Sequence, residues 1–195
     1  MRDFPKQHLE EIEVALIGCY LTRDKGGEFR IEYHLTLHPP PFLLHEEEAT
    51  EINRHEISLS GLPLNGSRDW RGISGKYKYG PDEIEGSFRA RNQWFPVDLP
   101  YLQIQYLEGT RFQIDGELTF CMECWDDCYR DFTMFISTEA AFTGYHSQVN
   151  TIGSDGDFSS LESTQAFLGK YLDVGSYTNL ACDGTFITMD PVDVE

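Results

Sequence analysis

Basic residues are scarce in this 195-residue chain, which has 15 lysine and arginine side chains against 33 aspartate and glutamate side chains. The resulting formal net charge of −18 makes nucleic acid a poor partner, because affinity for phosphate comes from clustered lysine and arginine. The anionic cytoplasmic face of a membrane repels such a chain for the same reason. A basic protein, a cation or a neutral ligand is compatible with this charge.

Long hydrophobic runs are also missing. No stretch approaches the roughly 18–20 apolar residues that a membrane-crossing helix needs. Residues 1–8 lack the basic and then apolar pattern of a secretory signal. The five cysteines are an odd number, which does not fit a disulfide framework and favours a reducing compartment. We therefore expect a cytoplasmic protein without a membrane partner, whose oligomeric state these features leave open.

Motifs that carry catalysis are absent as well. The chain has no Gly-x-Ser-x-Gly elbow, no P-loop, no His-Glu-x-x-His and no dinucleotide fingerprint. Carboxylate pairs suited to a glycosidase are always available among so many acidic residues, so their presence indicates nothing. The sequence favours binding over catalysis and identifies no catalytic residue.

What the chain does contain is hydrophobic alternation with a period of two. The apolar residues 14–22, the turn signal at 24–27 and the strict alternation over 29–37 predict a β-hairpin. About eight or more such short strands, with turns at regular spacing, predict an all-β fold, an antiparallel β-sandwich or barrel. The other strands are expected at residues 57–60, 76–79, 84–91, 102–106, 112–120 and 132–136, with a short last strand at 185–189.

Three local details follow from turn chemistry. The turn signal at residues 80–83 predicts a hairpin between residues 76–79 and 84–91. Pro96 and Pro100 are expected to bracket a connection, because proline cannot donate to a β ladder. Gly116 is expected to form a bulge within its strand.

The last third of the chain differs in composition and in the spacing of its apolar residues. Residues 138–157 are rich in Gly, Ser, Thr and Asn, and residues 159–172 have apolar side chains at helical spacing. We expect one domain over residues 1–195. It would consist of a β core at about 13–137 and an acidic, irregular or helical part at about 138–190 that includes a short helix.

The negative charge is concentrated in this last third. Residues 121–195 carry 13 acidic side chains and two basic ones, Arg130 and Lys170. Solubility alone can account for this charge. Electrostatic recognition can account for it too, and our main functional hypothesis is a non-catalytic, inhibitor- or immunity-like protein that masks a basic protein partner. The candidate contact residues are Glu123, Asp126, Asp127, Asp131, Asp155 and Asp157.

The alternative hypothesis is a small-molecule or carbohydrate-binding module. Trp70 and Trp94 are expected in connections, where exposed indole rings could stack on a sugar or plug the ends of the core. Asp155 and Asp157 lie in a Gly- and Ser-rich segment that resembles a calcium loop, although it does not fit an EF-hand. A solvated turn accounts for the same segment.

The three cysteines in residues 121–128 have two interpretations. Cys121 and Cys124 form a Cys-x2-Cys pair that could supply two zinc ligands, with Cys128 as a third. Alternatively, all three pack as small hydrophobic side chains in the core. We expect core packing and no cofactor, and keep zinc and calcium as weaker alternatives.

Six basic residues are clustered in the middle of the sequence. They could hold a phosphate or carboxylate, or simply form the solvated face of the expected hairpin. They are Arg68, Arg71, Lys76, Lys78, Arg89 and Arg91.

Overall fold

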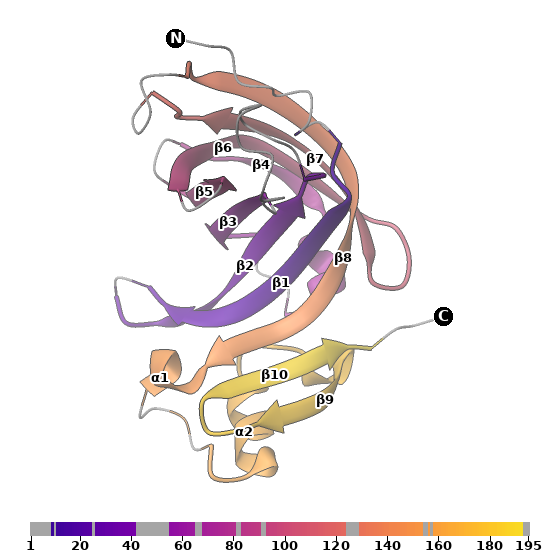
Figure 1. Ribbon diagram of the computed structural model, residues 1–195. Helices are drawn as coiled ribbons and strands as arrows, with labels where there is room; N and C mark the ends of the chain where they lie inside the picture. The colour runs from indigo at the N-terminus through magenta and orange to yellow at the C-terminus, as the bar shows by residue number, and fades with distance from the viewer. Residues whose placement is uncertain are drawn as a thin grey trace.

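A computed structural model describes residues 9, 11–24, 26–41, 55–64, 68–80, 83–90, 93–123, 129–153, 156 and 158–192. The predicted all-β fold is confirmed (Figure 1). The strands are β1 (Val14–Arg23), β2 (Phe29–His38), β3 (Glu56–Leu62), β4 (Gly75–Lys78), β5 (Glu85–Ala90), β6 (Gln93–Tyr106), β7 (Arg111–Phe120), β8 (Phe132–Gln148), β9 (Tyr177–Cys182) and β10 (Phe186–Pro191). The helices are η3 (Trp70–Ile73), α1 (Val149–Ile152), α2 (Leu161–Leu168) and η5 (Val174–Ser176).

Seven strands close into a barrel. Their order is β1-β2-β3-β5-β6-β7-β8, and neighbours along this path are antiparallel. The ring closes where β8 pairs with β1 in parallel, at Leu16 with Ala141 and Cys19 with Tyr145. Strand β4 lies off this path and pairs with β6. Closure removes most of the unpaired strand edges that an open sheet would expose.

The alternation of apolar residues sends one side of each strand into the barrel. In β1 the buried side chains include Ala15, Ile17, Cys19 and Leu21, and the same pattern continues in β2 and β7. Trp70, from η3, is fully buried, and its ring stacks on Phe142 with 4.7 Å between the ring centroids. The interior is thus a packed hydrophobic core centred on aromatic rings.

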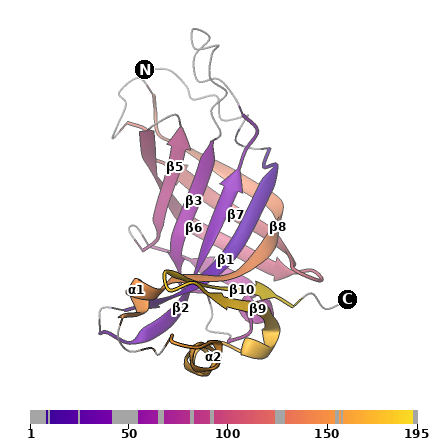
Figure 2. The same ribbon diagram turned by 60° about the horizontal axis from the view of Figure 1, so that its bottom comes forward.

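The C-terminal elements form a layer at one end of the barrel (Figures 1 and 2). Strand β8 extends beyond the barrel and pairs with β10, which pairs with β9. Gly144 permits this extension, because its φ is +101° and a Cβ there would lie 2.2 Å from the Met189 carbonyl oxygen. Helix α2 then packs against the β1–β2 hairpin, where the Phe167 and Phe29 rings form a T-shaped contact with 5.6 Å between their centroids.

Several sequence expectations are confirmed and others need correction. The hairpin β1–β2 forms as predicted, β6 and β7 include the strands expected at residues 102–106 and 112–120, and α2 and β10 lie within or close to the expected helix and last strand. The hairpin expected at residues 80–83 is wrong, because β4 and β5 both pair with β6 instead of with each other. Turn residues indicate where a strand ends but do not determine which strand it pairs with.

Three further differences concern strand continuity. Pro96 and Pro100 lie within β6, not in a connection. The register stays regular through Gly116 and shifts between Asp98 and Tyr101, so the predicted bulge is misplaced. Strand β8 runs to Gln148, well past residue 137, because its last residues find partners in β10.

Candidate functional site

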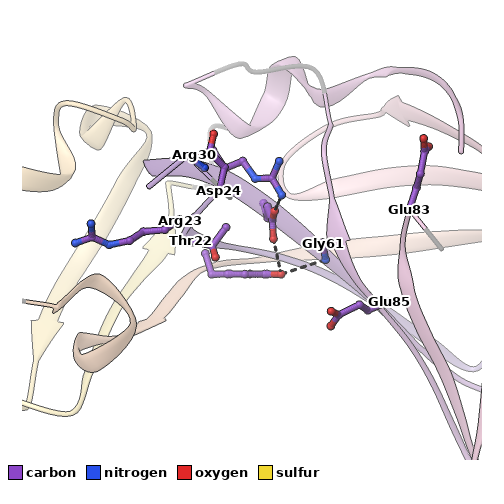
Figure 3. Close-up of a pocket in the computed structure, with 10 residues that line it drawn as sticks. Thr22, Arg23, Asp24, Arg30, Gly61, Glu83 and Glu85 are labelled. Atoms are coloured by element: carbon purple, nitrogen blue, oxygen red, sulfur yellow. Dashed lines mark hydrogen bonds and ion pairs between the residues drawn. The ribbon is translucent and has the colours of Figure 1, made fainter. Parts of the chain in front are cut away.

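A polar groove of about 810 Å³ opens on the outer face of the barrel, beside the β1–β2 hairpin (Figure 3). We call it the hairpin groove. Its residues come from the hairpin, from the end of β3 and from the segment that begins β5. They are Tyr20, Thr22, Arg23, Asp24, Gly26, Arg30, Glu32, Gly61, Glu83 and Glu85.

Strand alternation places the central side chains of the groove. Tyr33, Leu35 and Leu37 of β2 point into the core, so Glu32 points outward. Tyr20 is the cross-strand partner of Glu32 and therefore points to the same side of the sheet. The two side chains meet on the outer face because the hairpin register brings them opposite each other.

A connected set of polar contacts forms the inner wall of the groove. The Tyr20 hydroxyl donates to Glu32 Oε2 at 3.0 Å and accepts from the Gly61 N–H at 3.1 Å. Glu32 also forms an ion pair with Arg30. These contacts satisfy a carboxylate that is only 6% exposed, which is unusual for glutamate on an outward face.

Gly61 occupies a bulge that makes the contact with Tyr20 feasible. Between the pairs Tyr33–Leu62 and Leu35–Leu59, β3 contains one more residue than β2. Gly61 has a φ of +73°, in the left-handed region that glycine adopts readily. The bulge thereby directs a backbone N–H toward the groove.

Burial and the neighbouring carboxylate both act on Tyr20. Desolvation raises the pKa of its hydroxyl to about 12, and the negative charge of Glu32 acts in the same direction. Tyr20 is therefore a neutral hydrogen-bond donor at physiological pH. In this form it donates the hydrogen bond that holds the Glu32 carboxylate.

The opposite wall of the groove carries Glu83 and Glu85. Ser60 of β3 pairs with Glu85, which brings this wall beside Gly61. The Glu83 carboxylate accepts a hydrogen bond from the Gly80 N–H at 2.7 Å. Neither glutamate forms an ion pair with any residue that the structure describes. In Figure 3 the side chain of Glu85 extends from its strand into the space facing the hairpin.

Both arginines of the groove are already engaged. Arg30 pairs with Glu32, and Arg23 donates to the Ile152 carbonyl oxygen at 2.9 Å while lying over the Phe29 ring. Asp24 accepts from the Gly26 and Glu28 N–H groups of its own turn. Glu83 and Glu85 thus provide negative charge that the groove's own cations do not neutralise. This arrangement suits a positively charged group better than an anion.

The acidic residues expected to bind a partner lie elsewhere. Glu123 and Asp131 are exposed, and Asp131 accepts a hydrogen bond from the Glu123 N–H at 2.9 Å. Asp131 therefore supports the local backbone between β7 and β8. The other candidates, Asp126, Asp127, Asp155 and Asp157, lie outside the described residues.

The two tryptophans expected in connections differ from each other. Trp70 is fully buried and its indole N–H donates to the Ser176 carbonyl oxygen at 3.1 Å, so its ring is not available to stack on a ligand. The alternative expectation for Trp70, a plug within the core, describes it better. Trp94 is 46% exposed, lies on β6, and has the Arg89 guanidinium over its ring.

The cysteines do not meet in the described part of the chain. Cys19 is buried in the barrel, 3.4 Å from the Tyr177 hydroxyl, and desolvation raises its pKa to about 12. Cys121 is partly exposed, while Cys124 and Cys128 lie outside the described residues. Among the residues that are described, no three histidine, cysteine, aspartate or glutamate side chains are placed to hold a metal ion.

The basic cluster of the sequence is divided in space. Lys76 and Lys78 lie on β4, and Arg89 lies on β5, which does not pair with β4. Arg68 donates to the carbonyl oxygens of Gly169 and Leu172, so it joins the barrel to the C-terminal layer. Arg71 pairs with Asp69, and Arg91 is outside the described residues. The expected single basic face is therefore wrong.

Sequence reasoning missed the hairpin groove because its residues come from three separate segments. One signal was available: a single glycine after alternating residues, as in Ser58–Leu62, is typical of a bulge. Glu32 within an alternating strand gave no sign of its burial. The closeness of Glu85 to the hairpin follows only from the pairing of β3 with β5.

Comparison of the chain with protein-family models, with curated proteins and with solved structures gives no match. In the described part of the chain, no helix is both long enough and apolar enough to cross a membrane.

Proposed function

We propose that this protein binds a basic protein partner and that the hairpin groove receives a lysine or arginine side chain of that partner. The observation that carries this proposal is the charge balance of the groove. Arg23 and Arg30 are engaged by other groups, whereas Glu83 and Glu85 face the groove without an ion pair among the described residues. A cationic side chain would complete the pairing.

The overall charge supports the same proposal. A net charge of −18 attracts a basic protein over long range and accelerates its association at low salt. The proposal includes a non-catalytic role and a cytoplasmic location, the compartment that the odd number of cysteines favours. Binding of a sugar between two indole rings is less favoured, because Trp70 is buried.

The direct test uses short peptides of known charge as probes. Tetralysine is titrated into the protein at low and at high salt, and tetraglutamate serves as the peptide control. We expect only tetralysine to bind, with an affinity that falls as salt rises. The amide resonance of Gly61 reports the site by NMR, because its N–H contacts Tyr20 in the groove wall. An affinity independent of salt would contradict the proposal.

Three substitutions with the same change of charge locate the binding. Glu85→Gln is expected to weaken tetralysine binding by about 3- to 10-fold, the scale of one ordinary hydrogen bond accessible to solvent. Glu162→Gln, on the exposed face of α2, controls for net charge. Glu123→Gln tests the surface that the sequence pattern favoured. Equal effects of all three would indicate overall charge alone, and a larger effect of Glu123→Gln would move the site out of the groove.

A further inference from the structure

Phe135 is an exposed aromatic ring on the outer face of the barrel, and the groove does not account for it. It lies on β8 and is 73% exposed, the highest value among the large hydrophobic side chains that the structure describes. Its neighbours Met134 and Ile136 are buried in the core. A shift of one residue would exchange the two faces, so the position of Phe135 is fixed by the packing of the core.

The residues around Phe135 are known from the strand register. Phe135 is the cross-strand partner of Glu117 on β7, and Glu117 is in turn the partner of Tyr101 on β6. In the next row, Ser137 is opposite Asp115, and the Ser137 hydroxyl donates to that carboxylate at 2.7 Å. The aromatic ring therefore lies directly beside Glu117, and Asp115 is its diagonal neighbour on the same sheet face.

The charge on β7 beside the ring is negative, while Lys78 and Lys76 of β4 lie at the far end of the same two rows, opposite Tyr101 and Gln103. Arg111 is occupied by Glu108 and Glu139. Neither Asp115 nor Glu117 forms an ion pair with another described residue. An exposed ring flanked by these two carboxylates matches a segment that alternates apolar and positively charged side chains.

We propose that the face formed by Tyr101, Asp115, Glu117, Phe135 and Ser137 docks a basic protein segment with an apolar side chain placed on Phe135. The lysine or arginine side chains of that segment pair with Glu117 and Asp115. A second copy of this chain is a poorer occupant, because a contact that places one Phe135 ring on the other would bring the carboxylates beside both rings together. This surface is separate from the hairpin groove. The groove lies on β1, β2, β3 and the start of β5, whereas this face lies on β6, β7 and β8.

The test compares two peptides that have the same charge. One alternates lysine with phenylalanine and the other alternates lysine with serine, so any difference in affinity measures the apolar contact. We expect the lysine–phenylalanine peptide to bind the native protein at least about fivefold more tightly, the scale of one aromatic contact in an interface. Phe135→Thr, which keeps a strand-forming residue, should abolish this difference.

Matched variants separate this face from the rest of the molecular surface. Leu161→Ser removes another exposed apolar side chain, 53% exposed on α2, and should leave the difference unchanged. Glu85→Gln should also leave it unchanged, because that residue belongs to the groove. Glu117→Lys should weaken binding of both peptides and provides a second test should Phe135→Thr fail to fold.

Two results would overturn the proposal. One is a preference for the lysine–phenylalanine peptide that persists in Phe135→Thr. The other is concentration-dependent self-association of the native protein by sedimentation that Phe135→Thr abolishes, which would assign the face to a second copy. Failure of tetralysine to bind at the groove would leave this comparison of peptides unaffected, so the two proposals can fail separately.

Discussion

On outer surfaces, charged side chains are usually exposed and large apolar ones are usually covered, but two outward-facing regions of this barrel show the opposite. On β2, the outward carboxylate of Glu32 is 6% exposed, whereas on β8 the outward ring of Phe135 is 73% exposed. Both residues are placed outward by the same alternation of buried and solvent-facing side chains. The alternation therefore determines the side of the sheet, and neighbouring groups determine what reaches water.

The difference arises from what each region has beside it. Glu32 lies where Arg30, Tyr20 and the bulge at Gly61 converge, so its oxygens exchange water for protein donors. Phe135 lies on a sheet face whose neighbours Glu117, Ser137 and Thr133 do not cover it. A buried carboxylate with partners contributes to structure, whereas an exposed ring without cover is available to a partner.

The largest expected effect concerns Glu32. Glu32→Ala should lower the free energy of unfolding by about 1–3 kcal/mol, because it removes the buried acceptor of the part-buried Tyr20 hydroxyl and the ion-pair partner of Arg30. The matched control is Glu139→Ala, another outward glutamate paired with an arginine but 54% exposed, for which we expect less than about 1 kcal/mol. Urea unfolding of the three proteins measures both values. Similar losses for both variants would show that the inner wall of the groove has no special role in stability.

Much of the fold could be predicted because its signals are local. The period of two in β2 and β7 identified the strands and the side of each that faces the core. Short turns joined β1 to β2 and β6 to β7, and in both cases the nearest segment in sequence is the partner. The pairing of β4 with β6 could not be predicted, because it joins distant segments and no local signal specifies it.

The candidate site was harder to predict from the sequence than the fold. Trp70 illustrates the reason: its Gly- and Ser-rich surroundings indicated a loop, but a tryptophan in η3 reaches the barrel interior and stacks on Phe142. The groove likewise depends on a bulge at Gly61 and on the approach of β5 to β3. Composition predicts a basic partner, which stays a prediction, while the location of the groove carboxylates required the sheet topology.

A smaller effect is expected from alkaline pH. The folded-state pKa of Tyr20 is about 12, above the ordinary value near 10, so its stabilising effect is complete below pH 10 and is lost as the pH rises through 12. Burial is the main cause and Glu32 the second, so Glu32→Gln should lower the pKa of Tyr20 part of the way toward 10. Tyrosinate absorbance as a function of pH measures it, and Tyr20→Phe identifies the transition. An unchanged transition in Glu32→Gln would mean that the charge of Glu32 does not act on this hydroxyl.

The smallest expected effect on stability is that of replacing Phe135, the exposed residue of the two compared. Phe135→Thr should change the free energy of unfolding by no more than about 0.5 kcal/mol, because the ring is mostly exposed and threonine is equally suited to a strand. Urea unfolding alongside Glu32→Ala measures the contrast between the two outward faces directly. A loss of about 2 kcal/mol or more, on the scale of a buried side chain, would mean that the ring is packed against the protein in solution. A negligible loss would show that the ring does not stabilise the fold, as expected for a side chain that serves to bind a partner.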